Sequence, residues 1–288
     1  TYYDEKRPFF LEGTNIFDFA WGGINNHWGF NFSWPTLFYS RRIGQAPRGD
    51  VDDYDYIDTP KETRILGAAK LTGKVGDNIN VGVLSAVTER TYAEYKLDGK
   101  NLEAEVEPLT HFGVVRMQKE LNDGKNSIGF MVTSVNRDLN SDAMKDLYAD
   151  NALTFGVDGW ITLDDSSNYV LSAAGIGSYK HGNNEYISRL QRAPYRYFQR
   201  PDASPNRYDT TKTYLAGWYG RAILNKQKGN FYLNASIGAV SPGFDYNDLG
   251  FQYWADKINI AVVSGYRWFN TTDIFRNRSL YGAVSYDS

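Results

Sequence analysis

Arginine is concentrated in one stretch of the chain, ISRLQRAPYRYFQRPDASPNRY at residues 187–208. Guanidinium groups bind phosphate and carboxylate groups through paired hydrogen bonds, so this stretch suggests an anion-binding loop. Its arginines are Arg189, Arg192, Arg196, Arg200 and Arg207. They could hold lipopolysaccharide phosphates or an acidic glycan, or the loop could be structural, with its arginines paired to acidic loops. The residue types alone leave both interpretations open.

Charged residues also occur near the N-terminus and at alternating positions of later segments. An N-terminal segment that entered the interior of a barrel would need charged partners on the wall. The candidate plug and lumen charges are Glu5, Arg7, Glu12, Arg41, Arg42, Asp158, Arg221 and Arg267, with Arg116 as a further strand charge. For the N-terminal charges, the alternative to a plug is a solvated lead-in. For the later charges, a selectivity surface competes with structural ion pairs across the interior.

Acidic residues cluster in the stretch GDVDDYDYIDTP at residues 49–60. Carboxylate oxygens are the ligands that calcium prefers, so the stretch is a candidate calcium site. Its ligands would be Asp50, Asp52, Asp53 and Asp55. A second candidate set is Asp245, Asn247 and Asp248. Neither matches the complete twelve-residue calcium loop with its closing glutamate, and a solvated run of charges is the alternative. No other cofactor is predicted.

Catalysis has little support in the sequence. Cysteine is absent, which excludes thiolate chemistry, and His27, His111 and His181 are far apart. No H-E-x-x-H, G-x-S-x-G or Walker motif is present. A phospholipase on a barrel wall would need a serine beside a histidine. Only His111 lies in a predicted strand, and no partner serine is evident among its neighbours, so we expect a protein that is not an enzyme.

Period-two alternation marks the elements that must position these residues. GNFYLNASIGAV, residues 229–240, alternates apolar residues with polar or small ones. In 151–163, Leu153 and Phe155 share one side, and Thr154 and Asp158 share the other. The predicted strands are 35–44, 64–73, 79–90, 109–121, 126–139, 151–163, 168–179, 212–224, 229–240, 257–269 and 278–287. Short Asn/Asp/Gly/Lys turns alternate with long connections at about 91–108, 140–150, 180–211 and 241–256.

Composition and this rhythm of connections indicate the fold. The chain has 288 residues, and no apolar run approaches the roughly 18 residues of a spanning helix. Short turns that alternate with long loops, and strands of about ten residues with one apolar face, are typical of outer-membrane barrels. The sequence predicts an all-β fold, an antiparallel transmembrane outer-membrane β-barrel with about eleven visible strands. Residues 1–34 would be the lead-in or plug, and residues 35–288 would be part of a larger, incomplete barrel.

Five stretches carry a resemblance to a known family. They are EKRPFFLEG (5–13), FYSRRIG (38–44), ILGAAKLTGK (65–74), YFQRPD (197–202) and SPGFDYNDLGF (241–251). In order and spacing they resemble the barrel region of a Bacteroidota outer-membrane family of unknown function. In that family, a domain similar to carbohydrate-binding module family 9 precedes the barrel, and this chain lacks it. The resemblance implies a barrel fold and an envelope location but no reaction.

The sequence therefore predicts a barrel in the outer membrane of a Gram-negative bacterium, with a transport or binding role. The resemblance adds a glycan or its fragment as substrate. Expected partners are outer-membrane lipid, lipopolysaccharide, a glycan and an envelope protein complex, whereas the net charge of −3 gives no sign of nucleic acid. One alternative is a non-conducting scaffold barrel blocked by residues 1–45. The other is a soluble carbohydrate-binding β-protein. Aromatic residues in one groove would suit sugar binding, and aromatic residues at strand ends, as at Tyr266, Trp268 and Phe269, would suit a membrane.

Overall fold

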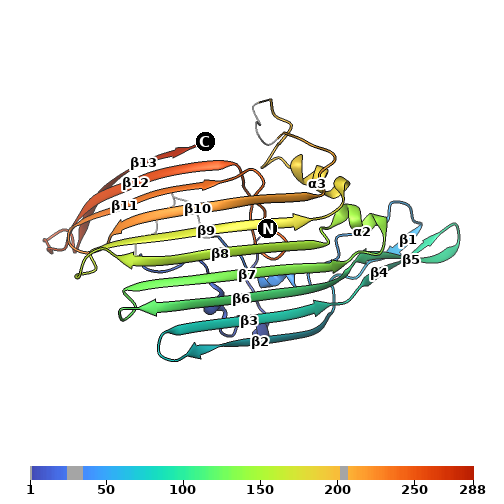
Figure 1. Cartoon of the computed structure of the whole chain (residues 1–288), viewed down its shortest axis with the longest axis horizontal. Helices are drawn as coiled ribbons and strands as arrows, with labels where there is room; N and C mark the ends of the chain where they lie inside the picture. The colour runs from blue at the N-terminus through green and yellow to red at the C-terminus, as the bar shows by residue number, and fades with distance from the viewer. Residues whose placement is uncertain (1, 25–34, 202–206) are drawn as a thin grey trace.

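A large antiparallel sheet forms most of the computed structural model, which describes residues 2–24, 35–201 and 207–288 (Figure 1). Its strands are β2 (Ile65–Val75), β3 (Ile79–Thr88), β6 (Leu109–Leu121), β7 (Asn126–Asp138), β8 (Asn151–Thr162), β9 (Tyr169–His181), β10 (Tyr214–Lys226), β11 (Phe231–Val240), β12 (Lys257–Trp268) and β13 (Arg278–Asp287). They pair in the order β13-β12-β11-β10-β9-β8-β7-β6-β3-β2. The predicted all-β, antiparallel fold is confirmed.

Short turns join the strands at one end of the sheet, and long connections join them at the other (Figure 1). The turn between β6 and β7 uses Asn122, Asp123 and Gly124, with φ values of 53°, 54° and 80°. Asparagine, aspartate and glycine are the residues that best tolerate this left-handed conformation, which lets the chain reverse within four residues. The predicted alternation of short and long connections is therefore confirmed.

The long connections contain regular structure of their own. They include helices α2 (Asp142–Leu147) and α3 (Asn184–Gln191) and a small sheet of β1 (Tyr56–Asp58), β4 (Thr91–Leu97) and β5 (Lys100–Glu107). The predicted loop at 91–108 is thus a hairpin, because Asp98 and Gly99 adopt the positive φ values, 51° and 75°, of a two-residue hairpin turn. Over residues 2–24, 35–201 and 207–288, no helix has the length and apolar character needed to span a membrane.

The two faces of the large sheet differ in composition, because the exposed face is largely apolar and the buried face mixes charged, polar and apolar side chains. On β8, Leu153 and Phe155 are 48% and 50% exposed, whereas Asp158 is 4% exposed. On β12, Ile260 is exposed and Asn259 is buried. In a soluble antiparallel sheet the apolar face normally packs on the core and the polar face meets water. The predicted division of each strand into two faces is confirmed, and the exposed apolar face departs from the soluble pattern.

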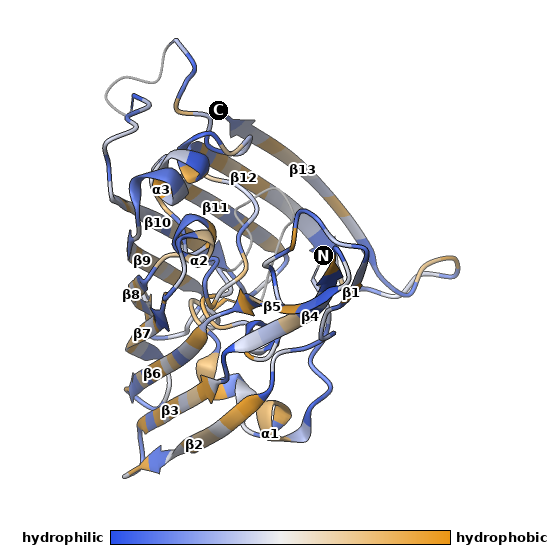
Figure 2. Ribbon diagram, turned by 90° about the vertical axis from the view of Figure 1, so that its right-hand side faces the viewer, coloured by the Kyte–Doolittle hydropathy of each residue, from blue (hydrophilic) through white to orange (hydrophobic). Residues whose placement is uncertain are grey.

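The N-terminal segment, residues 2–24, lies on the concave face of the curved sheet (Figure 2). It includes α1 (Pro8–Leu11) and the 3₁₀ turn η1 (Thr14–Phe17). Phe10, Phe17 and Phe19 are buried in one core cluster with Leu84 of β3 and Val114 of β6. The segment therefore covers the inner face of the sheet. Residues 1 and 25–34 of the predicted lead-in lie outside the described residues.

Residues 35–44 do not form the first predicted strand. Thr36 makes an isolated bridge to Phe251, and Ser40–Arg42 form the 3₁₀ turn η2. The apolar residues of this stretch are spaced for packing against the sheet, since Leu37 and Ile43 are buried in the same core cluster as the N-terminal phenylalanines. Among the described residues, the large sheet consequently has ten strands instead of eleven.

The predicted closed barrel is not found. In the described ranges, the edge strands β2 and β13 do not pair with each other, so the sheet is open. Every residue of β13 is exposed, because no described element covers either of its faces. The ten strands curve around the N-terminal segment without bringing the two edges together (Figure 2).

Candidate functional site

A buried ion pair joins the sheet to the N-terminal segment. Arg116 on β6 and Asp158 on β8 are both buried, and two guanidinium nitrogens contact the two carboxylate oxygens at 2.5 and 2.9 Å. The Oδ2 atom of Asp158 also accepts a hydrogen bond of 2.7 Å from the backbone N–H of Ala20. Arg221 on β10 donates to the carbonyl oxygen of Ala20 at 3.2 Å. Together, these four residues form a clamp that fixes Ala20 to the large sheet. They are Ala20, Arg116, Asp158 and Arg221.

Close packing accompanies the clamp. The ring of Phe19 lies over Gly156 of β8, where an added Cβ would be only 2.5 Å from the ring. The guanidinium of Arg116 lies over the same ring, 5.3 Å from its centroid. Ala20 has a φ of 60°, a left-handed conformation that costs an alanine roughly 1–2 kcal/mol. Such strain persists where the surrounding contacts determine the backbone, and here they come from the clamp and the phenylalanine.

Glu5 and Arg7 of the predicted plug charges form a separate contact with η2. Their side chains pair at 2.7 Å, and Arg7 donates to the carbonyl oxygens of Ser40 and Ile43 at 2.9 and 2.7 Å. The hydroxyl of Ser40 donates to Glu5 at 2.5 Å. Burial would raise the pKa of Glu5, but the hydrogen bonds from Arg7 and Ser40 outweigh it and lower the pKa to about 2. These two charges therefore bind the two N-terminal stretches to each other.

The other predicted lumen charges lie apart from one another. The side chain of Glu12 is exposed, and Arg41 is half-buried. Arg42 donates to a backbone carbonyl of the 241–256 connection at 3.1 Å. Arg267 on β12 lies over the ring of Tyr232, 4.6 Å from its centroid. Of the predicted set, only Asp158 and Arg221 meet in the clamp.

A second buried charge cluster lies where the 241–256 connection meets β9. Lys180 contacts Asp245 at 2.8 Å and Asp248 at 2.6 Å. Arg196 pairs with Asp245, and Arg137 pairs with Asp248, both at 2.8 Å. Burial would raise the pKa of Asp245, but Lys180 and Arg196 outweigh it and lower the pKa to about 2. The two aspartates of the second predicted calcium site are thus balanced by cationic side chains.

The arginines of the predicted anion-binding loop separate in the structure. Arg192, Arg196 and Arg200 pair with Glu185, Asp245 and Asp256, respectively. Arg189, on α3, donates to the backbone carbonyl of Leu147 at 2.9 Å, and Arg207 is exposed. Three of the five arginines therefore show the pairing that the structural alternative expects. Anion binding by this loop stays a prediction.

The four aspartates of the first predicted calcium site do not converge. Asp50, Asp52, Asp53 and Asp55 are all exposed. In the part of the chain that the structure describes, no group of three or more His, Cys, Asp or Glu side chains could hold a metal ion. Calcium binding by this stretch stays a prediction.

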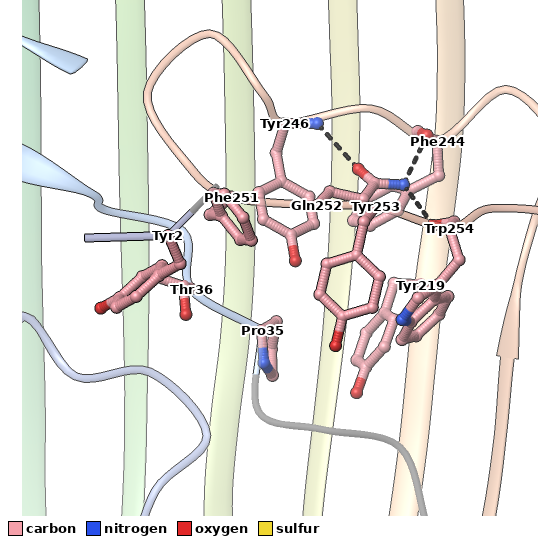
Figure 3. Close-up of a pocket in the computed structure, with 10 residues that line it drawn as sticks. All are labelled: Tyr2, Pro35, Thr36, Tyr219, Phe244, Tyr246, Phe251, Gln252, Tyr253 and Trp254. Atoms are coloured by element: carbon pink, nitrogen blue, oxygen red, sulfur yellow. Dashed lines mark hydrogen bonds between the residues drawn. The ribbon is translucent and has the colours of Figure 1, made fainter. Parts of the chain in front are cut away.

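An aromatic pocket of about 310 Å³ lies beside the N-terminal segment and the 241–256 connection (Figure 3). The rings that line it are Tyr2, Tyr219, Phe244, Tyr246, Phe251, Tyr253 and Trp254. The side-chain amide of Gln252 accepts from the N–H of Tyr246 at 3.1 Å and donates to the carbonyls of Phe244 and Trp254 at 3.0 and 2.9 Å (Figure 3). These bonds fix the shape of the connection. No signal in the sequence indicates this pocket, because five of its rings lie in one connection without a recognisable motif, and only the fold adds Tyr2 and Tyr219 to them.

The structure also corrects the expectation that His111 has no partner serine. The Oγ atom of Ser85 on β3 lies 2.9 Å from Nε2 of His111 on β6. The two residues are 26 positions apart, and the β3–β6 register places Ser85 opposite Gly113, two residues from His111. His181 instead contacts Asp150 at 2.9 Å, and His27 lies outside the described residues.

One family model matches the entire chain. A family model described as a domain of unknown function, DUF5916, matches residues 1–288. No curated protein matches the chain. The predicted membership of an uncharacterised family is confirmed, whereas the Bacteroidota origin and the associated carbohydrate module stay predictions. The chain therefore belongs to the DUF5916 family.

Proposed function

We propose that the chain forms part of the wall of an outer-membrane β-barrel in a Gram-negative bacterium, with the N-terminal segment as its plug. The exposed apolar face of the large sheet carries this proposal. Phe155, Ile237 and Ile260 are exposed apolar side chains on this face, while Asp158 and Arg116 face inward. In water, exposed apolar surface costs about 25 cal/mol per Å², so a face of this kind needs an apolar partner.

Exposed aromatic residues at both ends of the strands support lipid as that partner. Tyr266 and Trp268 are exposed at the C-terminal end of β12, on the side of the sheet where the short turns lie. Tyr179 and Tyr214 are exposed at the opposite end, where their rings stack at 6.0 Å. Tyrosine and tryptophan favour the membrane–water interface, and barrels carry an aromatic girdle at each edge of the lipid-facing band. In this arrangement the long connections face the outside of the cell.

Closure of such a barrel requires strands between β13 and β2. A sheet edge within lipid would leave backbone N–H and C=O groups without hydrogen bonds, each at a cost of several kcal/mol. We infer that further strands complete the wall. The Bacteroidota origin, the preceding carbohydrate-binding module and an envelope complex as partner belong to the same proposal and derive from the resemblance.

Depth-dependent substitution tests the membrane location. Phe155→Arg places a cation near the middle of the apolar rows, and we expect it to lower the free energy of unfolding in lipid vesicles by about 2–4 kcal/mol. Asn151→Arg, at the end of the same strand and on the same face, is the matched control and should cost about 0–1 kcal/mol. Urea titration of vesicle-inserted protein measures both. Equal costs for the two variants, or a full-length protein that stays dispersed without detergent, would refute a lipid-facing surface.

The clamp favours a second candidate function, a non-conducting barrel that serves as a scaffold in an envelope complex. The clamp fixes Ala20 to the wall, and Phe17 and Phe19 fill the space along the concave face. Single-channel conductance in planar bilayers separates the candidates, with the full-length protein compared with its Asp158→Ala variant. Steady pores in the variant alone support gated transport. Silence from both inserted proteins supports the scaffold where protease cleaves within residues 10–19 of the variant, which shows that the segment has undocked.

The aromatic pocket supports a binding role for a glycan. A sugar ring presents an apolar C–H surface that packs against aromatic rings, and a pocket of about 310 Å³ lies at the lower end of the size range of small-molecule sites. Trp254 and Tyr253 supply flat rings, and phenol groups supply hydrogen-bonding atoms (Figure 3). We infer that one ring of a neutral oligosaccharide occupies it.

A further inference from the structure

The Ser85–His111 pair lies at a boundary on the outer face of the sheet. Cross-strand pairing arranges the outward residues in rows. The row nearest the long connections contains Val87, His111, Asn136, Asn151, His181 and Tyr214. The next row contains Ser85, Gly113, Ser134, Leu153 and Tyr179, and the row below it contains Val83, Val115, Val132 and Phe155. Ser85 therefore lies between a mostly polar row and a fully apolar one.

Three side chains with catalytic chemistry surround Gly113. Ser85 Oγ and His111 Nε2 are 2.9 Å apart, the distance expected between a nucleophile and its general base. A Cβ added to Gly113 would lie 2.7 Å from the hydroxyl oxygen of Ser134 and 3.9 Å from Cε1 of His111. Because Gly113 has no side chain, the hydroxyl of Ser134 lies over it, between Ser134 and Ser85, and His111 is exposed on the same face. An ester carbonyl that approaches this face meets Ser85 on one side of Gly113 and Ser134 on the other.

We propose that Ser85, His111 and Ser134 form a hydrolase site for carboxylic esters of amphiphiles. Ser85 Oγ attacks the ester carbonyl carbon while Nε2 of His111 takes the hydroxyl proton, and the hydroxyl of Ser134 donates to the developing oxyanion. The C–O bond to the alcohol then breaks, and His111 returns the proton to the leaving alcohol. Water attacks the acyl-Ser85 ester with His111 again as base, which releases the carboxylic acid and restores the serine. The balance is one ester and one water to one acid and one alcohol.

The location identifies the class of ester. In a bilayer, the interfacial region lies immediately outside the hydrocarbon core, and acyl ester groups occupy this boundary. The boundary between the His111 row and the apolar row of Val83 and Val115 matches it, with these two valines next to Ser85 and Gly113 on the side of the acyl chains. A membrane lipid as substrate rests on the proposed membrane function, whereas ester cleavage by Ser85 does not.

Covalent labelling tests the nucleophile in the full-length protein. In detergent micelles, a fluorophosphonate probe should modify Ser85, as located by peptide mass spectrometry, and the protein should hydrolyse p-nitrophenyl butyrate. Ser85→Ala should abolish both signals. His111→Gln should slow labelling and hydrolysis by about 10²–10⁴-fold, and Ser134→Ala should slow hydrolysis by about 10²-fold. Ser264→Ala is the matched control. Ser264 is a half-buried serine on β12, on the same outer face of the sheet as Ser85, and its replacement should change neither rate.

The outcomes separate this site from the membrane proposal. An unlabelled Ser85 in folded wild-type protein, or equal hydrolysis by wild type and Ser85→Ala, overturns the hydrolase. Fatty-acid release from phosphatidylethanolamine vesicles by inserted wild type, and not by Ser85→Ala, supports the lipid substrate. Labelling of Ser85 in a protein that never inserts into vesicles supports the hydrolase proposal and refutes the membrane location. If Ser85→Ala fails to fold, the His111→Gln labelling rate decides alone.

Discussion

Replacement of Asp158 by alanine tests whether the clamp holds the N-terminal segment against the large sheet. Asp158 accepts hydrogen bonds from Arg116 at 2.5 and 2.9 Å and from the N–H of Ala20 at 2.7 Å. Removal of one partner of a buried ion pair costs about 3–5 kcal/mol, because the other charge is left uncompensated. Loss of the bond to Ala20 contributes about 1–3 kcal/mol to docking of the segment. The undocked population should therefore rise about 5- to 150-fold.

Three variants separate docking from overall stability. Arg116→Met breaks the ion pair but leaves Asp158 as the acceptor for Ala20. The double variant Arg116→Met/Asp158→Leu removes both charges, which often restores the stability of such a site, but it leaves the N–H of Ala20 without its acceptor. Limited proteolysis within residues 2–24 reports docking, and thermal unfolding reports stability. We expect Asp158→Ala and the double variant to expose the segment, and Arg116→Met to expose it less.

One result would refute this reasoning. If the double variant regains both its melting temperature and its resistance to proteolysis, the N–H of Ala20 needs no acceptor, and the segment is held by packing alone. The same conclusion would follow if proteolysis rates in all three variants simply tracked their melting temperatures.

Three further predictions concern packing, pH and ligand binding. Gly156→Ala should lower the free energy of unfolding by about 1–3 kcal/mol in denaturant titration, because its Cβ meets a buried ring, whereas Gly177→Ala, with open space above it, should not. Asp245 stabilises the fold above the ordinary carboxyl pKa of 3.8, and roughly 2 to 3 kcal/mol should be lost as pH falls toward its folded pKa of about 2. Thermal unfolding across pH should show that slope, and Asp245→Asn should show a shallower one, because Glu5 and Asp248, whose pKa values are also lowered, still contribute. Trp254→Ala should weaken calorimetric binding of a neutral oligosaccharide about tenfold, through an aromatic contact of about 1.4 kcal/mol, whereas Trp218→Ala on the outer face should not. Equal effects within either matched pair, or an acid slope in Asp245→Asn as steep as in the wild type, would contradict the corresponding prediction.

Period-two alternation is sufficient to predict most strands and both of their faces. Successive side chains of a strand point to opposite sides, so Leu153 and Asp158 can be assigned to different faces from spacing alone. The same signal gives a wrong strand at 35–44, because Leu37 and Ile43 alternate for burial beneath the sheet. Alternation alone does not distinguish a stretch that pairs within a sheet from one that packs against it.

The candidate sites are only partly predictable, and backbone atoms and register explain the remainder. Asp158 and Arg221 can be recognised as inward charges, but Ala20 takes part through its peptide group, which leaves no signal in the residue type. The Ser85–His111 pair depends on a bulge. Counting back from the Asp98–Gly99 turn would put Ser85 out of register by one residue, because the β4–β5 pairing shifts between residues 91 and 92. A slip of one residue exchanges the two faces of a strand, so the pair is visible only once the bulge is known.

The relative sizes of the contacts indicate how the N-terminal segment is held. Burial of Phe10, Phe17 and Phe19 contributes roughly 4 to 9 kcal/mol, since each buried phenylalanine adds about 1.5–3 kcal/mol. The bond from Ala20 to Asp158 contributes about 1–3 kcal/mol. The clamp therefore positions a segment that apolar packing retains, and loss of the clamp alone should loosen residue 20 without expelling the phenylalanines. Opening for transport would need a further event that favours the undocked state by several kcal/mol, such as a ligand or partner with higher affinity for it. The non-conducting scaffold needs no such event, so Asp158→Ala protein would favour it over gated transport only if protease also cleaves within residues 10–19, which shows that the phenylalanines have undocked, and the protein still stays silent in bilayers.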